Sequence, residues 1–161
     1  MQRFWRIITR FWSYYAPVLM IPYLVILWAC LWDWDVRAFL VLFIIVACCF
    51  LLPLGLAGFT KLVFFKHRPV PMELGNRRKK LMAGSFPSMH TITVVVIWTL
   101  WAVAFWESPY FIPVFCFYGV MAVLVMISRV KLKKHFVIDI FGGIGYAVVW
   151  LGIVYVVLMM L

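Results

Sequence analysis

Charge is scarce in this sequence, and negative charge is scarcest. Only 12% of its 161 residues are charged, with five acidic residues against 15 lysines and arginines. Soluble globular domains carry about 25% charged residues. With 68% hydrophobic residues and a mean hydropathy of +1.09, this composition excludes an ordinary soluble domain and indicates a multi-pass membrane protein.

Cysteine and histidine, two common metal ligands, are also few. All four cysteines lie inside apolar runs, where we interpret them as small buried side chains: Cys30, Cys48, Cys49 and Cys116. The three histidines contain no short-spaced ligand pair, so a zinc site built from them is poorly supported: His67, His90 and His135. The sequence therefore predicts no metal and no cofactor.

Long apolar runs make up most of the chain and predict an all-α polytopic membrane helix bundle, with a single domain over residues 1–161. Five of these runs approach or exceed the length of about 20 residues that crosses a bilayer. They cover residues 16–32, 38–60, 91–106, 111–127 and 136–161. Pro53 predicts a kink in the second run. Polar residues are almost absent from the first four runs, which disfavours a transporter or channel.

The first 15 residues follow a different pattern. Arg3, Arg6 and Arg10 share one helical face, and apolar and aromatic side chains fill the opposite face. This pattern predicts an amphipathic helix that lies in the membrane interface. A frayed polar tail is the alternative. A cleaved signal peptide is disfavoured, because the arginines interrupt any apolar core.

Five spans would place three polar segments on one side of the membrane: residues 1–15, 61–90 and 128–139. That side receives 14 of the 15 lysines and arginines, an excess that the positive-inside rule assigns to the cytoplasm. Because the basic residues flank membrane spans and do not form a soluble module, we expect the lipid bilayer as a partner and no nucleic acid. Nothing in the sequence implies an obligate protein partner.

The segment 128–139 combines a histidine, a carboxylate and a cation. His135 and Asp139 are four residues apart, so in a helix they share one face. A carboxylate there can hold one imidazole nitrogen protonated and leave the other as a nucleophile. Arg129 nearby indicates an anionic target.

The basic segment 61–90 contains two further patterns. Lys61 and Arg68 are seven residues apart, which in a helix puts them on one side about 10 Å apart along the axis. Ser88 directly precedes an apolar helix and is a good N-cap, and His90 follows it. The backbone N–H groups at such a helix start attract phosphate.

In this order and at these spacings, the patterns resemble the signature of the type 2 phosphatidic acid phosphatase superfamily: K-x6-RP, then PSGH, then SR-x5-H-x3-D. Ten specified positions match: Lys61, Arg68, Pro69, Pro87, Ser88, His90, Ser128, Arg129, His135 and Asp139. The one departure is Met89, where the family has glycine; its backbone N–H can still face a phosphate, while its bulk would narrow the pocket. The resemblance also implies a six-helix core, whose first member here would be the interfacial helix.

The resemblance implies a metal-free, two-step phosphoryl transfer. His135 would attack phosphorus and form a phosphohistidine, oriented by Asp139, and His90 would protonate the leaving oxygen and then activate water. The phosphate would be bound by Lys61, Ser88, the backbone at Met89, Arg68 and Arg129. A non-catalytic lipid-binding protein is the alternative from a different class.

The resemblance further implies a phosphorylated membrane lipid as substrate and the inner (cytoplasmic) membrane of a bacterium as location. Lipid A 1-phosphate is the leading candidate, and undecaprenyl diphosphate and phosphatidylglycerophosphate are alternatives. Most bacterial members carry the site on the outer face of that membrane, whereas the charge distribution favours the cytoplasmic face. The two arguments conflict, and the sequence leaves the face open.

Overall fold

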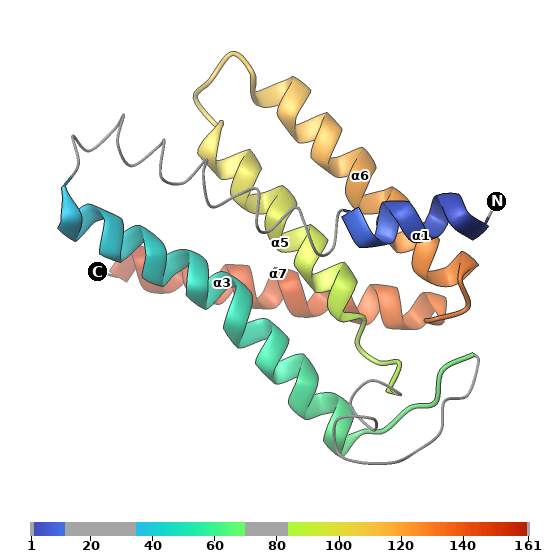
Figure 1. Ribbon diagram of the computed structural model, residues 1–161. Helices are drawn as coiled ribbons and strands as arrows, with labels where there is room; N and C mark the ends of the chain where they lie inside the picture. The colour runs from blue at the N-terminus through green and yellow to red at the C-terminus, as the bar shows by residue number, and fades with distance from the viewer. Residues whose placement is uncertain (1, 12–34, 70–83, 161) are drawn as a thin grey trace.

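The computed structural model describes residues 2–11, 35–69 and 84–160 (Figure 1). Within these ranges helix is the only regular secondary structure, and there is no strand. The helices are α1 (Gln2–Arg10), α3 (Val36–Val63), α5 (Met89–Ala104), α6 (Phe111–Lys131) and α7 (Val137–Met160). The predicted all-α bundle is therefore confirmed for the part of the chain that is described.

The number of membrane-spanning helices differs from the prediction of five. Among the described residues, three helices are long and apolar enough to cross a bilayer, namely α3, α6 and α7. The third predicted span is α5, which is apolar but has only 16 residues, or about 24 Å of helix against a hydrocarbon core of about 30 Å. The first predicted span, residues 16–32, lies outside the described residues.

Helix α5 packs against α3, α6 and α7 (Figure 1). Its buried side chains include Ile92 and Val96, which form the main core cluster with Cys49 and Ala57 of α3 and Ala147 of α7. Large apolar side chains are exposed along α3, α6 and α7. A protein with these three exposed apolar helices is a membrane protein, because lipid is the solvent that such surfaces require.

Two smaller expectations have mixed outcomes. Of the described cysteines, Cys49 is buried as predicted, Cys48 is half-buried, and Cys116 is exposed on α6. Helix α3 continues through Pro53, and Figure 1 shows it changing direction partway along its length, as a proline inside a helix predicts.

Glycines allow α7 to approach the start of α5. A Cβ atom at Gly143 would lie 2.8 Å from the carbonyl oxygen of Ser88, and one at Gly142 would lie 2.2 Å from the ring of Phe86. Only glycine fits such close contacts. These two residues let α7 lie directly against the segment that begins α5, which positions the site described below.

Helix α1 packs along the C-terminal part of α6 (Figure 1). Thr9 is buried and hydrogen-bonded to Ser128 of α6, and Ile8 packs against the cluster formed by Val94, Ala122 and Val125. The predicted N-terminal helix therefore exists over Gln2–Arg10. Its contacts are with the bundle, which its amphipathic pattern did not predict.

Candidate active site

Four chain segments meet at one end of the bundle. The N–H of Ser88 donates to the backbone carbonyl of Asp139 at 3.0 Å, and the ammonium group of Lys66 donates to the carboxylate of Asp139 at 2.9 Å. The bond between Thr9 and Ser128 adds α1 to this end. The predicted meeting of residues 1–15, 61–90 and 128–139 on one face is confirmed for their described parts.

A tight turn after α6 positions His135. Lys133 adopts a left-handed conformation with φ of 51°, which costs a residue with a side chain about 1–2 kcal/mol. The N–H groups of Lys134 and His135 then both donate to the carbonyl of Arg129, at 3.0 and 3.3 Å. The turn therefore holds His135 against the last turn of α6, beside Arg129.

The side chain of His135 is buried, with 2% of the residue exposed. Its Nδ1 lies 2.8 Å from the backbone carbonyl oxygen of Ser85. A carbonyl oxygen only accepts, so Nδ1 carries the proton and the neutral ring keeps its lone pair on Nε2. This is the tautomer that a nucleophilic imidazole requires.

Burial also keeps this imidazole neutral. Burial, together with the positive charges of Arg129, Lys61 and Arg68, lowers the pKa of His135 to about 2, although the hydrogen bond to the Ser85 carbonyl acts in the opposite direction. The free protein therefore holds His135 uncharged over the whole physiological pH range. Attack by Nε2 needs no prior removal of a proton from this ring.

Asp139 does not make the predicted hydrogen bond to His135. Its Oδ2 lies 3.9 Å from Nδ1, because the same oxygen accepts the N–H of Phe136 at 2.8 Å, while Oδ1 accepts Lys66. The side chain thus caps the first turn of α7. At 3.9 Å it can still stabilise positive charge on the ring. The four-residue spacing correctly placed the two side chains together but assigned the wrong hydrogen-bond acceptor.

The start of α5 has the predicted capping geometry. The Ser88 hydroxyl accepts the N–H of Thr91 at 3.4 Å and the Thr91 hydroxyl at 3.0 Å, and Ser88 is fully buried. The side chain of Met89 packs against the main core cluster and is not among the residues that line the cavity described below. The methionine that replaces the family glycine is therefore accommodated by the core.

The predicted phosphate-binding cations lie close to both histidines. Lys61 is buried, with only 3% of the residue exposed. Its ammonium group donates to the carbonyl of Gly84 at 3.2 Å. Lys61, Arg68 and Arg129 all act electrostatically on His90 and His135. Three cations beside the N-terminus of a helix are an arrangement that can bind a tetrahedral anion.

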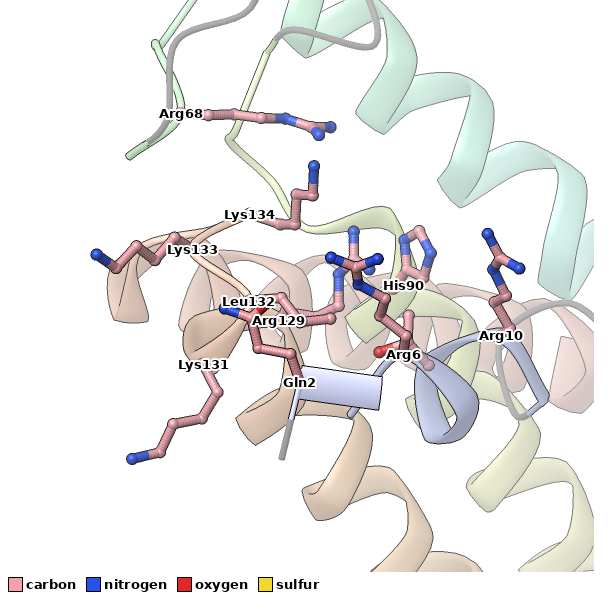
Figure 2. A pocket seen from close by; sticks show the side chains of 11 residues that line it. Gln2, Arg6, Arg10, Arg68, His90, Arg129, Lys131, Leu132, Lys133 and Lys134 are labelled. Carbon is pink, nitrogen blue, oxygen red and sulfur yellow. The ribbon is translucent and has the colours of Figure 1, made fainter. Parts of the chain in front are cut away.

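A cavity of about 710 Å³ opens at this end of the bundle (Figure 2). Three of the predicted site residues line it: Arg68, His90 and Arg129. Four others are buried and do not line it: Lys61, Ser88, His135 and Asp139. Among the described residues, no group of three His, Cys, Asp or Glu side chains is placed to hold a metal ion.

Three parts of this site were absent from the sequence prediction. Ser85 supplies the carbonyl that orients His135, and Lys66 supplies the ion pair with Asp139. The cavity is also lined by Gln2, Arg6, Thr9 and Arg10 of α1. The order of the predicted spans placed α1 on the same side of the membrane as the site. The sequence prediction nevertheless assigned its arginines to the membrane interface and not to the site.

Replacing Lys66 with glutamine should lower kcat by about two- to fivefold and leave KM nearly unchanged. The side chain is 40% exposed, and an ion pair with one exposed partner contributes about 1 kcal/mol or less. Lys66→Arg should restore most of the activity, and the exposed Arg37, which does not line the cavity, provides the control as Arg37→Gln. A loss of more than about tenfold would exceed the contribution of such an ion pair and would show that Lys66 does more than hold the carboxylate.

Comparison with known proteins identifies one family. The model of the PAP2 superfamily matches residues 36–161, a region that contains every predicted catalytic and phosphate-binding residue. No characterised protein and no solved structure matches the chain significantly.

Proposed function

Because the chain belongs to the PAP2 superfamily, a superfamily of phosphatases, we propose that it is an integral membrane lipid phosphatase that works through a phosphohistidine. The observation that carries this proposal is the state of His135. Its Nδ1 is tied to the Ser85 carbonyl, so Nε2 is the free nucleophilic atom, and three cations lie near the ring. A non-catalytic lipid-binding protein would not need a neutral imidazole beside so much positive charge.

In the first step, the Nε2 lone pair of His135 forms a bond to phosphorus as the bond between phosphorus and the leaving oxygen breaks. His90 lines the cavity, and in the free site burial and the charges of Arg129, Lys61 and Arg68 lower its pKa to about 3. The negative charge of the bound phosphate opposes this shift, so His90 takes up a proton with the substrate and gives that proton to the leaving oxygen. The phosphorylated ring becomes positively charged, and the Asp139 carboxylate at 3.9 Å stabilises it. Lys61, Arg68 and Arg129 bind the equatorial oxygens, where transition-state charge accumulates.

In the second step, water attacks the phosphohistidine. His90 takes the proton from that water, and the bond between Nε2 and phosphorus breaks, which returns His135 to its neutral form. Inorganic phosphate is the product. In both reaction steps, every catalytic role is filled by a side chain of the protein. We therefore expect turnover without a metal or cofactor.

The position of the site supports a lipid substrate. The cavity lies at one end of apolar helices, where the phosphate of a lipid would be held at headgroup level. We propose lipid A 1-phosphate as the leading candidate, with undecaprenyl diphosphate and phosphatidylglycerophosphate as alternatives. The location that fits these substrates is the inner membrane of a bacterium.

The test is phosphate release by the purified full chain from four lipids in EDTA: lipid A, undecaprenyl diphosphate, phosphatidylglycerophosphate and phosphatidic acid. We expect release from at least one of them, and inhibition by vanadate, which mimics the five-coordinate transition state. Activity that is lost in EDTA and restored by zinc or magnesium would contradict the metal-free mechanism. Binding of these lipids without any release would favour the non-catalytic alternative.

A further inference from the structure

Two arginines of α1 extend the positive charge of the site beyond the predicted residues. Arg6 and Arg10 are four residues apart, so they lie on one helical face, and both line the cavity. Figure 2 shows their side chains directed to the side of α1 on which Arg129 and His90 lie, whereas the side chains of Lys131 and Lys133, which also line the cavity, extend away from these residues. The family match begins at residue 36, so these arginines belong to no part of the family signature.

A buried hydrogen bond between α1 and α6 fixes the position of Arg6 and Arg10 relative to the site. The Ser128 hydroxyl donates to the carbonyl of Val125 at 2.6 Å, so in its bond with Thr9 it accepts the threonine proton. Thr9 is 4% exposed and lies between the two arginines in the helix. Because Ser128 directly precedes Arg129, the same bond couples α1 to the inner phosphate-binding residues.

The number of cations exceeds what one phosphate needs. Lys61, Arg68 and Arg129 already lie around the histidines, and three cations suffice for the oxygens of one transferred phosphoryl group. Among the described residues, no acidic side chain lines the cavity to neutralise Arg6 and Arg10. A cavity of about 710 Å³ has the size of a small-molecule site and is larger than a single phosphate group requires.

We propose that Arg6 and Arg10 form an outer anion subsite, which binds a second phosphate of the substrate while the first occupies the inner site at Arg129 and His90. The inference deepens the proposed function and rests on it for the identity of the anion as a lipid phosphate. The second phosphate either is joined directly to the first, as in a lipid diphosphate, or lies elsewhere on the headgroup. Both sources present the same chemistry to the two guanidinium groups.

Calorimetric titration of the full chain in uncharged detergent tests this subsite without turnover. The probes have carbon–phosphorus bonds that resist hydrolysis: methylphosphonate, methylenediphosphonate and 1,3-propanediyl diphosphonate. The variants are Arg6→Gln with Arg10→Gln, and Arg3→Gln as the matched control. Arg3 is an exposed arginine of the same helix that is not among the residues lining the cavity.

The wild-type protein should bind at least one diphosphonate tighter than methylphosphonate by about tenfold. In the double variant, this preference should fall roughly threefold for each arginine removed, because an exposed ion pair contributes somewhat under 1 kcal/mol. The same variant should bind methylphosphonate nearly as tightly as the wild type does. Arg3→Gln should keep the preference. Stronger binding of the methylene compound indicates a diphosphate lipid, and stronger binding of the propanediyl compound indicates two separate phosphates.

Three outcomes would overturn the subsite: no preference for either diphosphonate in the wild type, an unchanged preference in the double variant, or an equal loss in Arg3→Gln. These outcomes are independent of the proposed function. If the protein releases no phosphate from any lipid but shows the predicted preference, the phosphatase assignment fails and the subsite stands. If it releases phosphate but shows no preference, only the subsite fails.

Discussion

His135→Ala should lower phosphate release by about 10⁴-fold or more, because it removes the atom that attacks phosphorus, and loss of an enzyme nucleophile has effects of that size. The measurement is the initial rate of phosphate release from whichever lipid the wild type hydrolyses best. The substitution also leaves the buried carbonyl of Ser85 without its donor, a cost of about 1–3 kcal/mol in stability. Binding of methylphosphonate by the same variant shows whether the site has kept its fold.

His67→Ala is the matched control for this experiment. His67 is exposed, its ring packs edge-on against Phe65, and it does not line the cavity. Its removal should leave the rate within about twofold of the wild type, as is usual for a surface substitution. A His135→Ala protein that binds methylphosphonate and still hydrolyses lipid at the wild-type rate would remove His135 from the mechanism.

His90→Ala should slow turnover by about 10²–10⁴-fold, the usual contribution of a general acid and base. Formation and hydrolysis of the phosphohistidine should respond differently to the loss of His90 when the leaving group departs readily without a proton. With a lipid diphosphate, the first step needs little help from an acid, whereas hydrolysis of the phosphohistidine still needs a base. We therefore expect phosphorylated protein to accumulate, measured with ³²P-labelled substrate as protein-bound phosphate that is stable in alkali and labile in acid.

Adding His135→Ala to the His90→Ala protein is the internal control. The double variant should retain no alkali-stable phosphate, since the accepting nitrogen is gone. Labelling that persists in it would place the phosphate on another residue. A single His90→Ala variant that turns over at the wild-type rate would show that a different group supplies the proton.

The sequence determined which chain segments build the site, because the relevant signals are local. Long apolar runs predict helices, Ser88 at the start of one predicts its cap, and parity predicts which loops share a face. The spacing of Arg129, His135 and Asp139 within one short segment placed these residues together, as the structure shows. The family match covers residues 36–161, the part of the chain that contains these motifs.

Only the tertiary structure decided how these residues are paired, because each pairing joins segments that are far apart in the chain. His135 uses the carbonyl of Ser85, 50 residues away, and Asp139 uses Lys66, 73 residues away. No spacing rule relates such positions. Glycine contacts between α5 and α7 set their separation, and that separation determines which acceptor reaches the imidazole.

The role of α1 depended on tertiary structure most of all. Its amphipathic pattern predicts a helix in the membrane interface, and the structure leaves Phe4 and Ile7 of its apolar face exposed. The pattern did not predict that α1 also packs on α6, which the buried bond between Thr9 and Ser128 shows. This bond joins residues 119 positions apart, and through it Arg6 and Arg10 become part of the site.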